Sequence, residues 1–185
     1  MGKARAIRLL LGAALLAAVA VGCGHSQPAQ PHAGRMSTCR SADLAAHVDS
    51  SGSEMSQPFV VVALVNQSHF ACLLRGYPRL TAVGHAQGGP DRNLPLAVKQ
   101  GSTYQRADAG SRRLVLARGG AASFVIGTAL AYQGGAHIMR ISEFRVQPPG
   151  LVGWLPVPVD DLATAPPNSA IPVTVTALEL GATRH

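Results

Sequence analysis

Aromatic residues are scarce in this chain and make up only 4% of its 185 residues. Proteins that bind nucleic acid combine a basic stripe with aromatic side chains on which bases stack. The only adjacent basic pair is Arg112–Arg113, and the other basic residues are scattered. The composition therefore argues against nucleic acid as a partner.

Carboxylates are also few: the chain has nine acidic residues, and Asp160–Asp161 is the one adjacent pair. At the end of an expected strand such a pair is typical of a solvated turn rather than of an acid/base couple. The nucleophile elbow Gly-x-Ser-x-Gly, the Gly-x-Gly-x-x-Gly loop and the P-loop are absent. We predict a protein that is not an enzyme and that needs no cofactor.

Metal-ligand spacing is missing as well. No His-x-His or His-Glu-x-x-His pattern occurs among the seven histidines, which are His25, His32, His47, His69, His85, His137 and His185. We therefore predict no metal site, although convergence of His47, His69, His85 and His137 in space would indicate one.

The N-terminus carries the features of an export signal. Three basic residues precede an apolar run at 9–21, which is shorter than the roughly 20 residues of a membrane-spanning helix. The sequence AVGC (20–23) then resembles a lipobox, although lipoboxes more often have leucine where Ala20 stands. We predict a lipoprotein signal peptide at 1–22 with lipid on Cys23; the alternative is an ordinary secretory signal beside which Cys23 is incidental.

The residues that follow Cys23 predict a flexible tether and then one domain. Residues 23–36 are rich in Pro, Gln, Gly and His, a composition that suits a flexible tether. Residues 37–182 are long enough for one domain with a real core. Removal of the three basic residues of the signal lowers the net charge from +7 to +4, so part of the basicity belongs to the predicted signal peptide.

Three cysteines are an odd number for an exported protein. Lipid on Cys23 would leave Cys39 and Cys72 as the only partners for each other in an oxidising compartment. Neither lies in a Cys-x-x-Cys or Cys/His cluster, which argues against a metal site. A structural disulfide is the favoured interpretation, and a free or redox-active thiol is the alternative.

From residue 58 onward the sequence favours strands. The run 59–65 (FVVVALV) is continuous and rich in β-branched residues, as in a buried strand. Polar residues and then 71–75 (ACLLR) follow, which predicts that the two runs form a hairpin. The earlier stretch 41–48 fits a short helix or a first strand equally well.

Further short strands are separated by segments rich in glycine and proline. They are expected at 79–83, 94–98, 112–117, 123–132, 137–146, 151–159 and 171–180, with a loop at 84–93 and a glycine turn at 117–122. Pro156 and Pro158 alternate with apolar residues, which places their strand at a sheet edge. This pattern predicts an all-β, antiparallel sandwich.

Several of these segments match a known family in the same order: the lipobox, then CRSADL (39–44), residues 60–80, LVLARGGAASF (114–124) and FRVQPPG (144–150). The chain resembles an actinobacterial exported family known as domain of unknown function 4232, over roughly residues 37–160. The resemblance implies an immunoglobulin-like β-sandwich, often lipid-anchored, in which Cys39 and Cys72 form the disulfide. It brings no catalytic residues. The chain departs from the family in having Arg118 where members often have proline, and in lacking later cysteines that some members carry.

A few side chains are candidates for recognition. Arg75 and Tyr77 could form an interaction tip, but Gly76 and Pro78 favour a turn in which the tyrosine bonds to backbone. Trp154 is either a core residue or an exposed anchor, and its surroundings favour a surface loop. Asn66 begins a glycosylation sequon, which we interpret as a turn in left-handed geometry.

Together these features predict a non-enzymatic binding module on the outer face of a cell membrane. Its contact with the membrane would be the lipid on Cys23, and part of the protein would be released. Its partner would be an envelope protein or glycan. The alternative function is a carrier of a small ligand or metal in the envelope.

Overall fold

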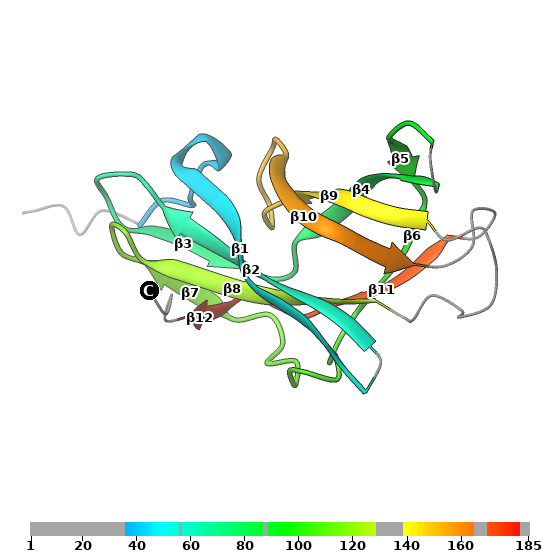
Figure 1. The fold of residues 1–185 in the computed structure, drawn as a ribbon. Coiled ribbons are helices and arrows are strands. Elements are labelled where there is room, and N and C mark those ends of the chain that lie inside the picture. Colours follow the sequence, from blue (N-terminus) through cyan, green and yellow to red (C-terminus); the bar gives the residue numbers. More distant parts are fainter. Residues whose placement is uncertain (1–35, 56, 87–88, 129–138, 165–169, 182–185) are drawn as a thin grey trace, which may run out of the picture. The chain divides into compact units, whose positions relative to one another are not determined.

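The computed structural model describes residues 36–55, 57–86, 89–128, 139–164 and 170–181, and most of this part of the chain is β-structure (Figure 1). These residues lie in one compact unit, Arg35–His185. In chain order the elements are the 3₁₀ turn η1 (Ser41–Asp43) and the strands β1 (Leu44–Glu54), β2 (Gln57–Asn66), β3 (Cys72–Arg75), β4 (Arg79–Ala86), β5 (Arg92–Leu94), β6 (Leu96–Gln100), β7 (Arg113–Leu116), β8 (Ala121–Thr128), β9 (Met139–Gln147), β10 (Leu155–Thr164), β11 (Ile171–Val175) and β12 (Glu179–Gly181). The described part of the chain contains no helix that could cross a membrane.

The strands form sheets that pack around one core. The largest sheet has the order β1-β2-β8-β11-β6, with β12 also paired to β8; the second has the order β10-β9-β4-β5; β3 and β7 form a two-stranded ladder. Buried side chains from all three sheets make one hydrophobic cluster, with Phe124 and Phe144 among its largest members. This arrangement confirms the predicted all-β sandwich.

The central strands of the large sheet are buried on both faces. All five residues of 60–64 on β2 are buried, as are residues 121–126 on β8. The loop 101–112 covers the outer face, where Arg106 donates from Nη1 to Ser123 Oγ at 3.1 Å. The continuous apolar run at 59–65 therefore reflects a strand with cover on both sides.

The predicted hairpin between 59–65 and 71–75 is wrong. Strand β2 pairs with β1 and β8, whereas β3 pairs with β7 in a different ladder. The polar residues that follow β2 carry the chain from one sheet to another. A strand, a short break and a second strand describe a crossover as well as a hairpin, and only the distant partners decide between them.

The sheet is also not purely antiparallel, because β11 pairs in parallel with β6 and antiparallel with β8. The predicted strand at 171–180 is in fact two strands, β11 and β12. Pro172 lies opposite Ala97 in the ladder with β6, and the described part of the ladder with β8 begins at Val173.

The other predicted strand and loop boundaries differ less from those of the structure. The stretch 41–48, left open between helix and strand, is the 3₁₀ turn η1 followed by the start of β1. The predicted loop 84–93 instead contains the end of β4 and the start of β5. Strand β8 ends at Thr128, and the rest of the run predicted at 123–132 lies outside the described residues.

Two predictions from glycine and proline are confirmed. Strand β10, which carries Pro156 and Pro158, lies at the edge of its sheet. The turn at 117–120 closes with a hydrogen bond from Gly120 N–H to the Ala117 carbonyl, and Gly119 has a φ of +71°. That φ lies in the left-handed region, which glycine enters without steric cost.

Candidate binding cleft

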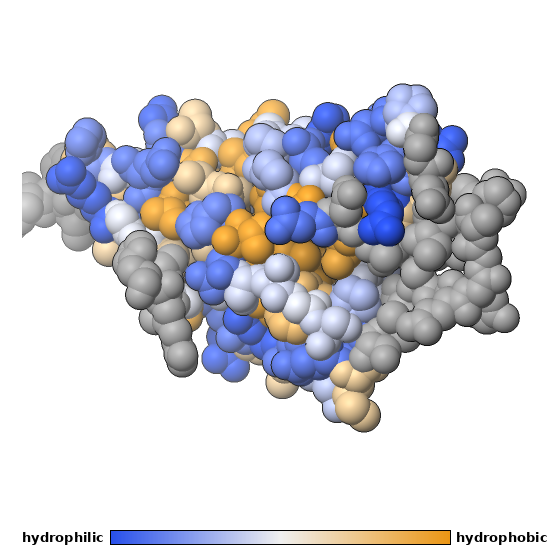
Figure 2. Space-filling model, in the orientation of Figure 1, coloured by the Kyte–Doolittle hydropathy of each residue, from blue (hydrophilic) through white to orange (hydrophobic). Residues whose placement is uncertain are grey.

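The open side of the sandwich lies where the edge strands of two sheets meet. Strand β1 is the edge of the large sheet, and β10 is the edge of the four-stranded sheet. Between them is a cavity of about 250 Å³, which we call the cleft. It is lined by Val48, Ser51, Gly52, Val60, Pro158, Val159, Asp160 and Leu162. Figure 2 shows apolar residues gathered between these two strands on this side of the molecule.

Both strands are irregular where they border the cleft. The register of β1 against β2 shifts between Val48 and Ser50, and that of β10 against β9 shifts between Pro158 and Leu162. A bulge bends its strand and re-aims the side chains beside it. The two bulges therefore contribute to the shape of the cleft.

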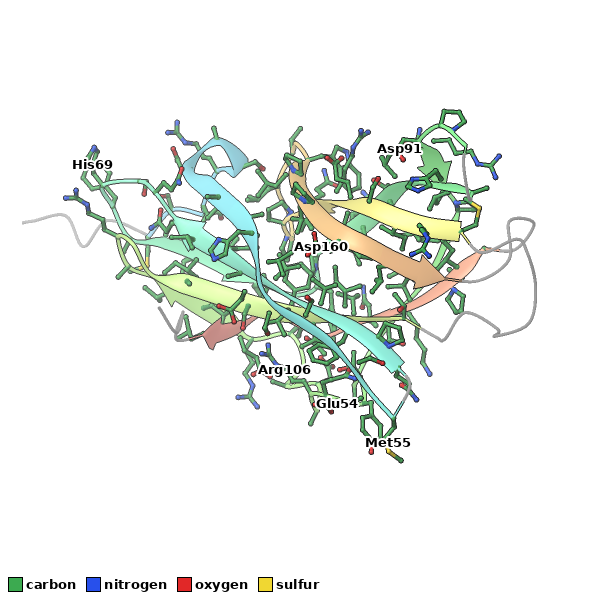
Figure 3. The ribbon with its side chains drawn as sticks, in the orientation of Figure 1. Glu54, Met55, His69, Asp91, Arg106 and Asp160 are labelled. Carbon is green, nitrogen blue, oxygen red and sulfur yellow. A yellow bond between two sulfur atoms is a disulfide. The ribbon has the colours of Figure 1, made fainter. Side chains whose placement is uncertain are left out.

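The cleft walls are mainly aliphatic, with one charged group. The carboxylate of Asp160 belongs to an exposed residue, and Figure 3 places it between the two sheets. It makes no ion pair with any described residue. This chemistry suits an apolar group with a positive charge beside it.

Two other cavities border the domain. One, of about 360 Å³, lies over the outer face of the large sheet; its lining includes the hydroxyl-bearing residues Ser102, Thr103, Tyr104, Thr128 and Thr174. The other, of about 290 Å³, lies beside the disulfide and is lined by residues from 37–43 and 68–72. Neither is lined mainly by aliphatic side chains.

Residues 39–179 match the family model described as domain of unknown function (DUF4232). The chain belongs to the DUF4232 family. The match starts at Cys39 and extends beyond the residues on which the sequence resemblance rested. No curated protein and no solved structure matches the chain.

The predicted disulfide of this DUF4232 domain is present. Cys39 and Cys72 are joined by an S–S bond of 2.03 Å, and both residues are buried. Two backbone bonds flank it, from Cys39 N–H to the Leu73 carbonyl and from Leu73 N–H to the Ser37 carbonyl. The disulfide therefore fixes the beginning of the domain to β3. Cys23, the predicted lipidation site, lies outside the described residues.

The three candidates for recognition do not form one site. Arg75 is exposed at the end of β3, where its cross-strand partner is another arginine, Arg113. Trp154 is 44% exposed in the loop before β10, as the sequence favoured. No hydrogen bond joins Arg75, Tyr77 or Trp154 to one another in the described structure.

Tyr77 has a structural role that involves a carboxylate rather than the predicted backbone bond. Its hydroxyl donates to Asp108 Oδ2, and Asp108 Oδ1 accepts from the Ala177 N–H at 2.7 Å. The Asp108 bond, together with partial burial, raises the pKa of Tyr77. Burial raises the pKa of Asp108, but hydrogen bonds from Ala177, Tyr77 and Gly110 outweigh it and leave this pKa below its usual range.

Asn66 is the polar residue whose importance the sequence did not reveal. It is fully buried at the end of β2, and its Nδ2 donates to the carbonyls of Phe70, Leu116 and Ala117 at 2.8–3.1 Å. Its Oδ1 accepts from both the N–H and the hydroxyl of Ser68. The predicted left-handed geometry is wrong, since Met55 is the described non-glycine residue with a positive φ.

The histidines that the structure describes do not converge. His47, His69 and His85 lie in different elements, and His85 Nδ1 is 2.8 Å from Asp91 Oδ1. Among the described residues there is no group of three or more His, Cys, Asp or Glu side chains that could hold a metal ion. His137 lies outside the described ranges.

Proposed function

We propose that this DUF4232 domain is a non-enzymatic binding module, held on the outer face of a cell membrane by lipid on Cys23. The lipobox-like AVGC (20–23) and the polar tether 23–36 support the anchor. The disulfide of the domain fits an oxidising compartment outside the cytoplasm. Actinobacterial origin is likewise part of this proposal and rests on the sequence resemblance.

The cleft between β1 and β10 carries the proposal. The hydrophobic cluster occupies the core of the sandwich, so we place the ligand at the rim, where the edge strands β1 and β10 meet. The rim cavity combines aliphatic walls from Val48, Val159 and Leu162 with the carboxylate of Asp160, which makes no ion pair in the described part of the chain. Concave apolar sites with a few polar groups are the usual form of binding sites.

The volume of the cleft favours a segment of a larger protein over a free small molecule as the ligand. Pockets for free small molecules usually enclose about 300–1,000 Å³, whereas this cavity measures about 250 Å³. That volume accommodates one or two apolar side chains. We therefore propose an envelope protein that inserts an apolar side chain next to a basic one.

A carrier of a small envelope ligand is the second candidate, and a different cavity favours it. The cavity of about 360 Å³ over the large sheet falls within the size range of small-molecule sites. Several of its lining residues bear hydroxyl groups, and Tyr104 is 56% exposed. These groups suit a polar ligand such as a sugar.

Site-specific cross-linking in intact cells tests the main proposal. A photoreactive amino acid at Ser51, on the rim of the cleft, is combined with Val159→Arg, which places a bulky cation in the cleft. The matched control is Val152→Arg, the same change at a residue that is 91% exposed outside the cleft. We expect one envelope protein to cross-link in the parent and in the control, and to be lost with Val159→Arg.

The anchor is tested in the same cells. Cys23→Ser should move the protein from the membrane fraction to the soluble fraction and abolish the cross-link. A cross-link that persists with Val159→Arg would contradict the cleft as the binding site. No cross-link from a well-expressed, membrane-bound parent would favour the small-ligand function instead.

A further inference from the structure

Phe70 is exposed without a packing reason. It is 78% exposed, the highest value among the aromatic side chains described, and it lies on the short loop after β2. The loop is nevertheless held firmly, because the Phe70 carbonyl accepts from Asn66 Nδ2 at 2.8 Å and from Ser68 Oγ at 2.7 Å. The loop is thus built to hold an apolar ring in solvent.

The chain enters the domain beside this loop. Leu73 N–H donates to the Ser37 carbonyl, and the disulfide joins Cys39 to Cys72, two residues after Phe70. Residues 37–40 and Phe70 line the same cavity of about 290 Å³. Residues 37–40 therefore lie beside Phe70 at this end of the domain.

A second loop lies at the same end of the domain. Asn66 Nδ2 bonds the Ala117 carbonyl as well as that of Phe70, so the turn 117–120 lies next to the Phe70 loop. We call the described segments 37–43, 67–72 and 117–120 together the disulfide end. The opposite end of β2, at Glu54 and Met55, is the hairpin end; Figure 3 shows His69 and Met55 far apart at these two ends.

The two ends differ in charge. At the disulfide end Asp43, the only acidic residue of these segments, is paired with Arg40 at 2.7 Å, while Arg118 is exposed without an ion pair to any described residue. The hairpin end carries Glu54, and the loop 101–112 with Arg106 lies near it, since Gln105 Nε2 donates to the Gln57 carbonyl. An anionic surface would thus attract the disulfide end through Arg118.

The length of the predicted tether favours the same orientation. Fourteen positions separate Cys23 from Ser37, and a flexible chain of this length has a mean end-to-end distance of about 20 Å. Strand β2 has ten residues and spans about 33 Å. On average the tether would therefore hold the disulfide end closer to the membrane than the hairpin end.

We propose that the disulfide end is a membrane-contact surface, in which the Phe70 ring enters the interface of an anionic bilayer and Arg118 contacts lipid phosphates. This inference rests on the proposed anchor at Cys23 and adds a defined orientation to it. The hairpin end then points away from the bilayer. The ligand chemistry is that of a lipid surface: an apolar layer beneath a layer of negative charge.

Tryptophan quenching in vesicles tests this surface. The lipidated mature protein carrying Trp154→Phe is reconstituted in phosphatidylglycerol/phosphatidylcholine vesicles whose acyl chains are brominated. Phe70→Trp supplies the probe, and Met55→Trp is the matched control, since Met55 is 77% exposed at the hairpin end. We expect several-fold stronger quenching and a blue-shifted emission for Phe70→Trp.

The role of the Arg118 charge and the lipid on Cys23 are tested by separate measurements. Adding Arg118→Glu to Phe70→Trp should weaken quenching on anionic vesicles more than on vesicles of phosphatidylcholine alone. Equal quenching at both positions, or none at either in a vesicle-bound protein, would overturn the membrane-contact surface and assign Phe70 to another partner. Absence of lipid on Cys23 by mass spectrometry would instead overturn the anchor, and the inference with it.

Discussion

Two polar side chains hold loops together in this domain, and they differ in burial. Asn66 is fully buried and ties the loop 67–70 to the turn after β7. Asp108 lies in the loop 101–112 at a half-exposed position, where it accepts from Tyr77 and from the Ala177 N–H. Both connect segments that no strand ladder joins.

The difference lies in what happens when the side chain is removed. The bond from Asn66 to the Leu116 carbonyl is buried, so its loss falls in a place that water enters with difficulty, whereas the Phe70 and Ala117 carbonyls keep bonds from Ser68 Oγ and the Gly120 N–H. Of the groups bonded to Asp108, the hydroxyl of the half-buried Tyr77 can turn to water, whereas the Ala177 N–H belongs to a buried residue. We therefore expect the buried Asn66 side chain to contribute more to the free energy of unfolding than the half-exposed Asp108 side chain.

The largest effect is expected from Asn66→Ala. The variant loses the five hydrogen bonds of the Asn66 side chain, and at roughly 1 kcal/mol for each the free energy of unfolding should fall by about 4 kcal/mol or more. Chemical denaturation followed by circular dichroism measures this. The control is Asn93→Ala, at an exposed asparagine on β5, which should change stability by less than about 0.5 kcal/mol. Similar small losses for both variants would refute the central role of Asn66.

Reduction of the disulfide should have the next largest effect. The bond spans a sequence separation of 33, for which the chain-entropy model gives about 3–4 kcal/mol. We expect the denaturation midpoint to fall when reductant is added to the wild type. In the double variant Cys39→Ala/Cys72→Ala the midpoint should already be low and should not respond to reductant. A reductant-insensitive wild type would contradict this.

Tyr77→Phe should have the smallest effect, and one that depends on pH. The pKa of Asp108 is lowered by folding, so its contribution is present above its ordinary value of 3.8 and is lost as pH falls through the folded-state pKa. The pKa of Tyr77 is raised, so its contribution is present below 10.0 and is lost as pH rises through the folded-state pKa. The stability difference from wild type should be constant at neutral pH and narrow at both extremes.

The matched control for this pH series is Tyr104→Phe, since Tyr104 is 56% exposed and lies in the same loop as Asp108. Thermal unfolding across the pH range should show no pH-dependent difference between this variant and wild type. A Tyr77→Phe difference that stays unchanged at low and high pH would show that ring packing, not the bond to Asp108, is responsible.

The sequence reveals the strands of this fold better than their pairing. Proline marks β10 as an edge strand because its missing N–H is a local property. The run at 59–65 indicates burial, but one of its two neighbours, β8, lies about 60 residues away, and local spacing carries no information on such a partner. For the same reason the parallel pair β11–β6 was not predicted.

In the candidate site, too, features with a local sequence signal were predicted, whereas contacts between distant residues were not. The disulfide was predicted because three cysteines leave few pairings. The Asp108 partner of Tyr77 lies 31 residues along the chain, and nothing in the local pattern connects the two. The cleft arises from bulges in β1 and β10, which are more than 100 residues apart, and its carboxylate, Asp160, has the sequence pattern of an ordinary solvated turn.

The insertion of β11 between β8 and β6 governs when the domain can finish folding. A chain that emerges N-terminus first exposes β8 and β6 long before Ile171–Val175 follows. Until then β8 lacks its β11 neighbour, and an unpaired strand edge is a place where other chains can add. The large sheet therefore becomes complete only after β11 has emerged, and the edge of β8 is open to other chains during that interval.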